Sequence, residues 1–236
     1  MKKIFGFTLA EVLITLGIIG VVAAITIPVL MQNYQKKVLI AKAKQGHSIL
    51  ENSIRRYMAD NGCDDMLCLF DVTKSSVEVA REFLSVVKSS HICTKSEKKF
   101  CSSYPLKSNN PKAAYKVDGK YAAGDSFGYL WRIYLPNGIS YVIGMSKGSC
   151  ILSGESPVLD KDGFDTGEKR PWSTDRCALV YMDTNGIQGP NQFGADVFRY
   201  DVKSDGKIYP YKNYMKNIIN KNYIDYKPYN LGAEVK

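Results

Sequence analysis

The sequence has 236 residues, of which 45% are hydrophobic and 23% are charged, and its formal net charge at pH 7 is +9. The charge is unevenly distributed: residues 34–60 carry +4 and residues 200–236 carry +3, whereas residues 61–199 carry only +1. The composition therefore excludes a chain that is basic throughout and places the positive charge in two separate segments.

An apolar run near the N-terminus contains a single charged side chain. Between Ile4 and Gln35 the only charged residue is Glu11. The run is long enough to cross a bilayer, and an ionised residue inside it costs about 2.5–3.5 kcal/mol at the helix centre and less near the end. Such a residue is expected to have a partner and a function.

The apolar run has three ordinary explanations. A secretory signal peptide has an apolar region of about 7–15 residues, which is shorter than this run, although Val22–Ala24 offers a small-residue cleavage site. A plain membrane anchor that tolerates Glu11 is the second explanation. A buried helix of a soluble protein is the third, and it is disfavoured because few such helices are apolar on every side over this length.

The stretch KKIFGFTLAEVLITLGIIGVVAAITIP resembles the class III signal of type IV prepilins and type II secretion pseudopilins. In that family a short basic leader ends in Gly, and the mature chain starts with Phe and carries Glu at its fifth position. The resemblance implies that a prepilin peptidase cleaves after Gly6 and methylates the amine of Phe7. It also implies that Glu11 pairs with the N-terminal amine of a neighbouring subunit, because each charge is costly alone in a low dielectric. Pairing of Glu11 with its own N-terminus before assembly is the alternative.

The same resemblance implies a domain organisation. Residues 1–6 are the expected leader, residues 7–31 the membrane-spanning half of a long helix, residues 32–61 its extramembrane half, and residues 62–236 a globular head. The expected fold is α+β and pilin-like, with the long helix packed on an antiparallel β-sheet. The 175 residues of the head suffice for a hydrophobic core of their own.

The resemblance also implies partners and a location. The expected partners are the prepilin peptidase, other pilin or pseudopilin subunits, the inner-membrane assembly platform and the lipid bilayer. The expected location is the inner (cytoplasmic) membrane, as a single-pass protein with its head outside the cytoplasm, and then a periplasmic or cell-surface filament. Lysines flank the apolar run on both sides, so the loop charges do not fix this orientation. A type II secretion pseudopilin and a minor type IV pilin both fit the sequence.

Six cysteines, all after the apolar run, indicate disulfides in an oxidising compartment. They are Cys63, Cys68, Cys93, Cys101, Cys150 and Cys177. The sequence leaves their connectivity open, and we expect sequence neighbours to pair (63 with 68, 93 with 101, 150 with 177) because short loops close easily. A zinc site is the alternative, but there is no Cys-x-x-Cys pair, and neither His47 nor His91 stands at a ligand spacing.

Helical periodicity continues beyond the apolar run. Apolar or small residues recur at steps of three and four at Leu39, Ala43, Gly46, Leu50, Ile54 and Tyr57 or Met58. They predict one long helix, softened at Pro28, that continues to about Ala59 and ends at Asn61-Gly62.

The head is predicted to begin with a helix and to continue with strands. Residues 75–90 predict a second helix, because Ser75 and Glu78 have capping-box spacing. Its expected buried face is Val77, Ala80, Leu84 and Val87. Residues 94–126 are rich in Lys, Ser, Asn and Gly and are predicted to be loops.

Five strands are predicted in the second half of the chain. Residues 127–135 and 139–146 predict a hairpin around Pro136-Asn137-Gly138. The other expected strands are residues 177–183, 198–202 and 207–210. Helices followed by a run of strands indicate the α+β class.

Two acidic stretches are candidate metal sites. The stretch DTNGIQGPNQFGAD offers the oxygen ligands Asp183, Asn185, Asn191 and Asp196. It loosely resembles the C-terminal loop that binds calcium in major pseudopilins, and calcium takes about six to eight oxygen ligands. Residues 160–168, with four acidic side chains, are the weaker candidate. The alternative is that these residues form turns without a metal.

Motifs of catalysis are absent from the sequence, and a second binding function is an alternative. There is no Gly-x-Ser-x-Gly, phosphate loop or His-based metal motif, so no enzyme is expected. Residues 207–232 interleave Lys with Tyr, the types that contact phosphates and stack on bases. A DNA-binding minor pilin of an uptake machine is therefore an alternative, as is a membrane-tethered extracytoplasmic binding domain.

Overall fold

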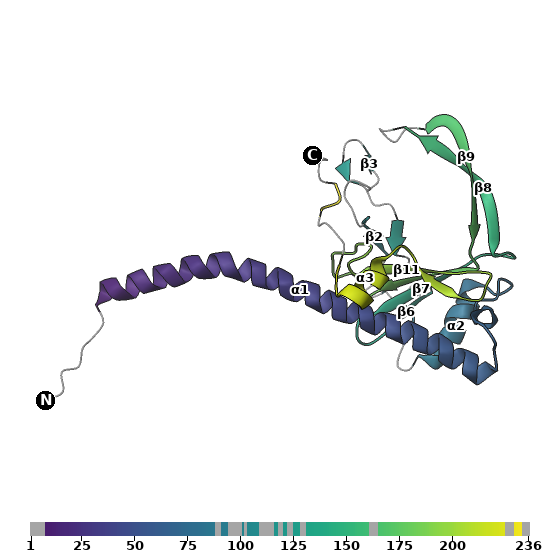
Figure 1. Ribbon diagram of the computed structural model, residues 1–236, viewed down its shortest axis with the longest axis horizontal. Helices are drawn as coiled ribbons and strands as arrows, with labels where there is room; N and C mark the ends of the chain where they lie inside the picture. Colours follow the sequence, from purple (N-terminus) through teal and green to yellow (C-terminus); the bar gives the residue numbers. More distant parts are fainter. Residues whose placement is uncertain are drawn as a thin grey trace. The chain divides into compact units, whose positions relative to one another are not determined.

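The structure is a computed structural model of the chain. It describes residues 8–87, 91–93, 101, 103–108, 116–117, 120–121, 125–127, 131–160, 165–224 and 229–232. The chain divides into two compact units, Met1–Val38 and Leu39–Lys236. Its longest element, helix α1 (Leu9–Asn61), contributes residues to both units (Figure 1).

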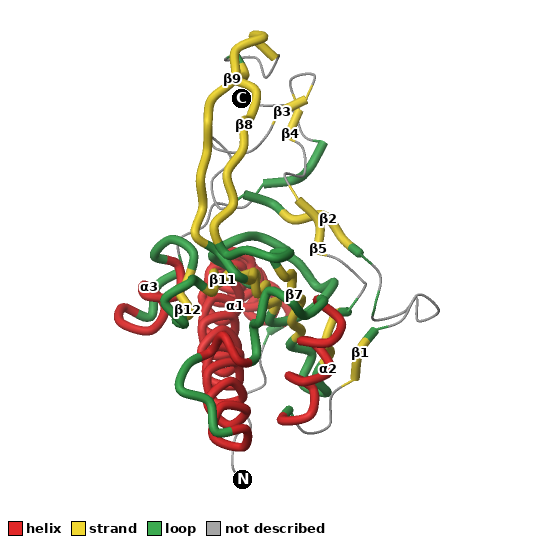
Figure 2. Tube along the Cα trace, turned by 90° about the vertical axis from the view of Figure 1, so that its right-hand side faces the viewer, coloured by secondary structure: helices red, strands yellow, loops and turns green. Residues whose placement is uncertain are grey.

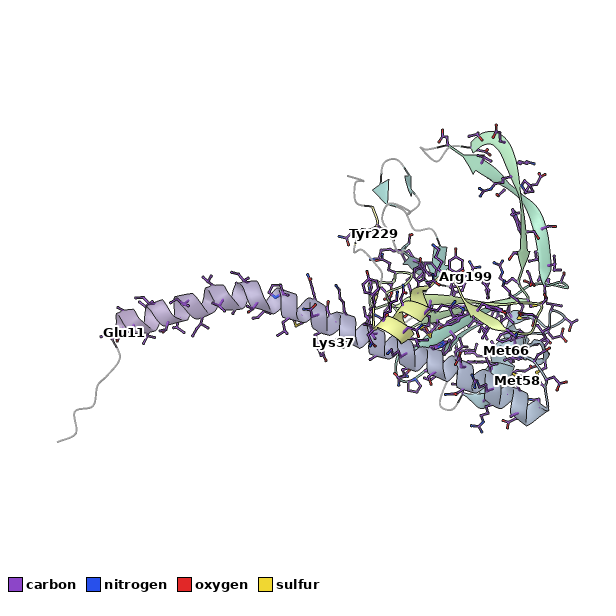
Figure 3. All side chains as sticks on the ribbon, viewed as in Figure 1. Glu11, Lys37, Met58, Met66, Arg199 and Tyr229 are labelled. Carbon is purple, nitrogen blue, oxygen red and sulfur yellow. A yellow bond between two sulfur atoms is a disulfide. The ribbon has the colours of Figure 1, made fainter. Side chains whose placement is uncertain are left out.

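The first unit contains the apolar part of α1. The helix passes through Pro28 without a break, so the predicted single long helix is confirmed. From Leu9 to Lys37 nearly every side chain is exposed, and Figure 3 shows side chains pointing outward around this part of the helix. By length and composition α1 contains a segment that can span a membrane, and none of that segment is buried in the protein.

The second unit begins with the rest of α1. Its buried residues are Leu39, Ala43, Gly46, Leu50, Ser53, Ile54 and Tyr57, which confirms the predicted face. The helix ends at Gly62, whose φ of +65° favours glycine. The amide of Cys63 donates to the carbonyl oxygen of Met58 at 2.9 Å, as in a Schellman C-cap.

A six-stranded antiparallel sheet forms the centre of the head, with the strand order β1-β6-β7-β10-β11-β12. The strands are β1 (His91–Ile92), β6 (Arg132–Tyr134), β7 (Ser140–Met145), β10 (Ala178–Asp183), β11 (Val197–Val202) and β12 (Ile208–Pro210). The register places Val142 opposite Tyr181 and Tyr181 opposite Arg199, and these side chains share one face. The opposite face, with Tyr141 and Met182, joins the main hydrophobic core together with α1. The fold is therefore α+β, with a long N-terminal helix and an antiparallel sheet head, as predicted.

The helix lies closest to the sheet at Gly46. A Cβ atom added there would be 2.5 Å from the sulfur of Met182, which is fully buried. The hydroxyl of Tyr141 donates a hydrogen bond to the carbonyl oxygen of Gly46 at 2.7 Å. Glycine therefore lets the helix backbone and the sheet approach each other directly.

The second helix, α2 (Ser76–Val86), has the predicted capping box between Ser75 and Glu78. Its predicted buried face was partly wrong, because Val79 and Phe83 are buried while Val77 and Leu84 are only half-buried. The ring of Phe83 packs edge-on against Tyr141, with centroids 5.7 Å apart. This aromatic contact turns the helix so that the large ring, rather than Leu84, enters the core.

The strand predictions for residues 139–146, 177–183, 198–202 and 207–210 are confirmed by β7, β10, β11 and β12. The predicted strand over residues 127–135 is confirmed only at β6, because Trp131 is a turn residue with a φ of +60°, Phe127 belongs to β5, and residues 128–130 lie outside the described residues. The prediction of loops over residues 94–126 was wrong in part, because β2 (Tyr104–Leu106) pairs with β5 (Asp125–Phe127) and β3 (Lys116–Val117) pairs with β4 (Lys120–Tyr121).

Sequence analysis also missed β1, the short 3-10 helix at Met66–Cys68, β8 (Ile151–Leu159), β9 (Asp165–Asp175) and helix α3 (Tyr214–Lys221). Residues Asp165–Ser173 of β9 are all exposed. Such a strand has no buried face, so it lacks the alternating apolar pattern that predicts a strand.

All six cysteines form disulfides, in the local pairs expected from the sequence. They join Cys63 to Cys68, Cys93 to Cys101 and Cys150 to Cys177. The ligand atoms of His91, Cys93 and Cys101 lie within 4.8 Å of one another, but both sulfurs are in the disulfide. A disulfide sulfur is not the thiolate that zinc binds, so the structure does not support the zinc alternative at this cluster.

Candidate functional site

The first candidate site is the start of α1, where Figure 3 labels Glu11. Its carboxylate accepts hydrogen bonds from the Thr8 amide at 2.9 Å and from the Thr8 hydroxyl at 2.8 Å. The Glu11 amide in turn donates to the Thr8 hydroxyl at 3.3 Å. This reciprocal pair has the form of a capping box. Within the single chain, Glu11 is therefore held by its own first turn, and its charge is not neutralised by Thr8.

The other two residues predicted for processing, Gly6 and Phe7, lie outside the described residues. Glu11 itself is exposed, and within the described part of the chain its carboxylate accepts hydrogen bonds from Thr8, which carries no charge. Its position in the first turn also suits a carboxylate, because the N-terminal end of a helix carries partial positive charge.

The second candidate site is the loop between β10 and β11. Asp183 and Asp196 are fully buried at its two ends. Asp183 accepts the amides of Asn185 at 2.8 Å and Gly186 at 2.7 Å. Asp196 accepts the amide of Asn191 at 2.8 Å and that of Gln192 at 2.7 Å. The two carboxylates thus fix the loop backbone, as the turn interpretation predicted.

Two residues that sequence analysis missed complete this site. The hydroxyl of Tyr104, on β2, donates a hydrogen bond to Asp183. The guanidinium of Arg132, which is 1% exposed, lies 5.0 Å from the centre of the Tyr104 ring. Tyr104 was hidden because its segment was predicted to be a loop. Arg132 carried a signal in the sequence, since it is the only charge in the apolar stretch FGYLWRIYL.

Burial dominates the electrostatics of this pair. Burial, followed by the negative charge of Asp196, raises the pKa of Asp183 to about 7. Burial raises the pKa of Asp196 to about 6, against hydrogen bonds from Gln192 and Asn191 that lower it. A pair of like charges held in a low dielectric favours a proton or a bound cation. The two buried carboxylates of this loop therefore favour binding of a proton or of a cation.

The four predicted ligands differ in how their oxygens are used. The side-chain oxygens of Asn185 and Asn191 are buried and have no hydrogen-bond partner among the described residues. Their amide nitrogens donate to carbonyl oxygens of the same loop, Asn185 to Gly189 at 3.1 Å and Asn191 to Ile187 at 3.4 Å. Unpartnered buried oxygens beside two carboxylates are the donor type that calcium takes. Asn185 and Asn191 therefore offer oxygens of the kind that calcium takes, whereas all four carboxylate oxygens of Asp183 and Asp196 already accept hydrogen bonds.

The weaker acidic stretch, residues 160–168, does not form a comparable cluster in the part that the structure describes. Asp160, Asp165 and Glu168 are exposed, and Asp165 accepts the amide of Gly167 at 2.8 Å in a local turn. Asp162 lies outside the described residues.

The basic C-terminal surface includes stacked pairs of cations and tyrosines. The guanidinium of Arg199 lies 4.3 Å from the Tyr211 ring centre, and Lys203 lies 5.2 Å from that of Tyr209. Arg199 also binds Asp201 through two hydrogen bonds of 2.9 and 3.2 Å. The protein's own cations therefore cover part of the ring faces that nucleic-acid bases would use.

Comparison with known proteins bears on the N-terminus. Residues 1–27 match the family model described as the prokaryotic N-terminal methylation motif. The chain carries the signal of type IV prepilins and pseudopilins. No curated protein and no solved structure matches the chain significantly.

The prepilin signal has direct consequences for the rest of the chain. It implies processing by a prepilin peptidase and assembly with other pilin subunits. The signal and the apolar helix fit a protein that is anchored in a membrane and then enters a filament. Proteins with this signal are in general structural rather than enzymatic.

The buried acidic pair predicts how the stability of the head depends on pH. In EDTA, the free energy of unfolding should fall by about 0.5–1 kcal/mol between pH 6.5 and 8.5, because folded Asp183 loses its proton near pH 7 whereas an unfolded Asp loses it near pH 4. His47, whose pKa burial lowers, contributes in the opposite direction by at most about 0.4 kcal/mol over this range, because an unfolded His is half protonated near pH 6.5. Denaturant unfolding of the solubilised protein, followed by tryptophan fluorescence, measures the effect.

The matched control is Asp183→Asn, which cannot ionise and should flatten this slope. A wild-type stability that rises over the same pH range would contradict the assigned pKa shift.

Proposed function

We propose that the protein is a structural subunit, a minor pilin or pseudopilin, of a type IV pilus-like or type II secretion filament. Prepilin peptidase cleaves it after Gly6, methylates Phe7, and the mature chain polymerises through α1. The observation that carries the proposal is the methylation motif at residues 1–27 together with an apolar segment of α1 that is not buried in the protein.

The exposed surface of α1 supports this assignment on energetic grounds. Large apolar side chains such as Leu13, Ile18 and Ile25 are 62%, 61% and 68% exposed. Burying each side chain of this kind contributes about 1.5–3 kcal/mol. A bilayer provides that burial before assembly, and helices of neighbouring subunits provide it in a filament. The apolar segment of α1 can therefore be buried either in the bilayer or in the filament, and it can move from the first to the second.

Glu11 favours burial of α1 in the filament over burial in the bilayer. In the single chain its carboxylate is held by Thr8, which supplies hydrogen bonds but no charge. A methylated ammonium on Phe7 of a neighbouring subunit would supply both. Because an ion pair in a low dielectric is favourable only when its geometry is good, the pair would fix the axial register between subunits. In a plain membrane anchor the same carboxylate would only raise the free energy of insertion, because it would have no cationic partner.

The location follows from the disulfides and the signal. Three disulfides in the head support folding in an oxidising compartment. We therefore place the subunit in the inner membrane as a single-pass protein, with residues 7–31 in the bilayer and residues 62–236 outside the cytoplasm. Its partners in this proposal are the prepilin peptidase, the assembly platform and other subunits.

The role of Glu11 can be tested by substitution in cells that carry the assembly machinery. Glu11→Ala should leave membrane insertion, leader cleavage and head folding intact but remove the subunit from sheared filaments, because the neighbour's ammonium loses its partner. Glu11→Gln should be a partial defect, since an amide accepts a hydrogen bond but carries no charge. Immunoblots of the membrane and sheared fractions measure the distribution.

The matched control for this experiment is Thr8→Val, which removes the hydroxyl that binds Glu11 within the chain but keeps the carboxylate. It should assemble normally. Normal assembly of Glu11→Ala would show that the residue is tolerated rather than required.

Calcium binding at the loop between β10 and β11 is a second proposal. Its ligands would come from Asp183, Asn185, Asn191 and Asp196, and the bound cation would neutralise the two buried carboxylates and lock the loop. The unpartnered side-chain oxygens of Asn185 and Asn191 favour this proposal over turn formation alone.

Thermal unfolding tests the calcium proposal. Millimolar calcium should raise the melting temperature of the wild-type protein after EDTA treatment, because a ligand that binds only the folded state stabilises it. Magnesium should have little effect, since it prefers a rigid octahedral shell. Asn185→Ala should abolish the shift, and Asn220→Ala, in α3, should retain it. Equal shifts with both ions, or none, would contradict the proposal.

A further inference from the structure

Residues 209–223, which run from β12 through α3, form a basic surface that the proposed filament subunit does not explain. We call this stretch the α3 surface. It contains Lys212, Lys216 and Lys221 and no acidic residue. All three lysines are exposed, and the ion pairs found among the described residues involve none of them. Their positive charge is therefore available to a partner.

The α3 surface also exposes apolar side chains. Ile219 is 43% exposed and Tyr223 is 53% exposed, and the side chains of Tyr209 and Tyr211 are exposed as well. Among the described residues of the second unit, half of the exposed large apolar side chains lie in this short stretch. Apolar side chains that cluster on a surface in this way mark an interaction site.

Helix α3 presents both kinds of side chain on its outer face. Its inner face, with Tyr214, Met215 and Ile218, is buried in the main hydrophobic core. Lys216 and Ile219 are three residues apart, so they are neighbours on the helix surface, and both are exposed. Basic and apolar side chains that stand together on an exposed helix are typical of a helix that lies on a membrane surface.

The α3 surface lies next to the helix that carries the membrane-spanning candidate. The ammonium of Lys44, on α1, donates a hydrogen bond to the side-chain oxygen of Asn222 at 2.6 Å. Figure 2 shows α3 beside β12, on the opposite side of α1 from α2. Lys44 follows the proposed bilayer segment, residues 7–31, by thirteen residues, which is about 20 Å of helix. The contact between α1 and α3 therefore stays close to the bilayer, and a tilt of α1 within the usual range brings it closer.

A lipid surface with negative headgroups satisfies both kinds of side chain. Each basic residue close to an anionic leaflet strengthens the association about fivefold. Lysine places its ammonium at the headgroup phosphates while its aliphatic stem covers apolar surface, and tyrosine is enriched at the same depth of a membrane. The exposed Ile219 is buried at the boundary with the acyl chains.

Nucleic acid is the other polyanion that could bind lysines, but the tyrosines argue against it. The guanidinium of Arg199 lies 4.3 Å from the ring centre of Tyr211, and the ammonium of Lys203 lies 5.2 Å from that of Tyr209. These cations cover ring faces on which bases would stack. The phosphate backbone of a duplex also offers no apolar environment for Ile219. The combination of side chains therefore favours a membrane.

We infer that the α3 surface docks on anionic phospholipid headgroups of the membrane in which α1 is anchored. Lys216 and Lys221 contact the phosphates, and Ile219 enters the boundary with the acyl chains. The inference rests on the proposed function in so far as residues 7–31 lie in the bilayer. The contact holds the head at the membrane surface before the subunit enters a filament.

Photocrosslinking to lipid in the full-length protein tests this contact. A benzophenone amino acid replaces Ile219, and the protein is reconstituted in vesicles of phosphatidylcholine or of phosphatidylcholine mixed with phosphatidylglycerol. After irradiation, intact mass spectrometry should detect a lipid adduct in the mixed vesicles and about tenfold less in the neutral ones. The same probe at Ile151, which is 66% exposed on β8, should give no more adduct in mixed than in neutral vesicles.

Removal of charge gives an independent readout with a matched control. The double variant Lys216→Gln, Lys221→Gln should lower the adduct yield from position 219 about tenfold, because each lysine strengthens the association about fivefold. Lys147→Gln removes an exposed lysine outside the α3 surface and should leave the yield unchanged. Equal yields in the two kinds of vesicle, or equal effects of these variants, would overturn the inference.

A labelled DNA duplex, added to the protein in neutral vesicles, tests the nucleic-acid alternative. The protein should not retain the duplex at physiological salt. Retention that the double variant Lys216→Gln, Lys221→Gln abolishes, without a lipid adduct at position 219 in mixed vesicles, would assign the α3 surface to nucleic acid and overturn the inference.

An alkaline carbonate wash of the same vesicles separates this inference from the proposed function, because it releases proteins that do not span the bilayer. Protein that resists the wash but gives no anionic-lipid-dependent adduct would overturn the contact and leave the anchored subunit standing. An adduct in the mixed vesicles from protein that the wash otherwise releases would support the surface and contradict the membrane-spanning helix. Absence of both would overturn both.

Discussion

The first half of α1 must be buried by something outside its own chain, and the rest of the molecule depends on this constraint. From Leu9 to Lys37 the helix is almost entirely exposed, and its only charge before Lys36 is Glu11. Water is a poor environment for such a surface. A bilayer satisfies the apolar side chains but not the carboxylate, whereas a bundle of identical helices with free N-terminal ammonium groups satisfies both. The prepilin signal at residues 1–27 fits this solution.

The head buries one face of α1 from Leu39 onward. From Leu39 the same helix packs on the sheet, and Gly46 lets its backbone approach Met182 and accept the hydroxyl of Tyr141. Cys63 and Cys68 close the loop directly after the helix. The core contacts, the hydrogen bond from Tyr141 and this disulfide together fix the second half of α1 in the head.

The sequence predicted the parts of the fold that have a buried face. The repeat from Leu39 to Tyr57 and the strands around residues 132–145 and 178–202 were found because one side of each enters the core. The β8–β9 hairpin was missed because none of its described residues is fully buried, so no apolar alternation marks it. In the acidic loop, spacing identified Asp183 and Asp196, but Tyr104 comes from a strand far away in the chain. A contact between residues far apart in the chain depends on the topology of the fold, which local sequence patterns do not reveal.

The mature N-terminus tests the central claim most directly, because both the ion pair and the polymerising helix require that cleavage creates an amine next to Glu11. Mass spectrometry of the protein purified from membranes should identify an N-terminal peptide that starts with N-methylated Phe7 and contains Glu11. Replacement of Gly6 by a bulky residue should leave the leader attached. A mature chain that starts near Ala24 or Ile25, or that retains Met1 in the presence of active prepilin peptidase, would contradict the account.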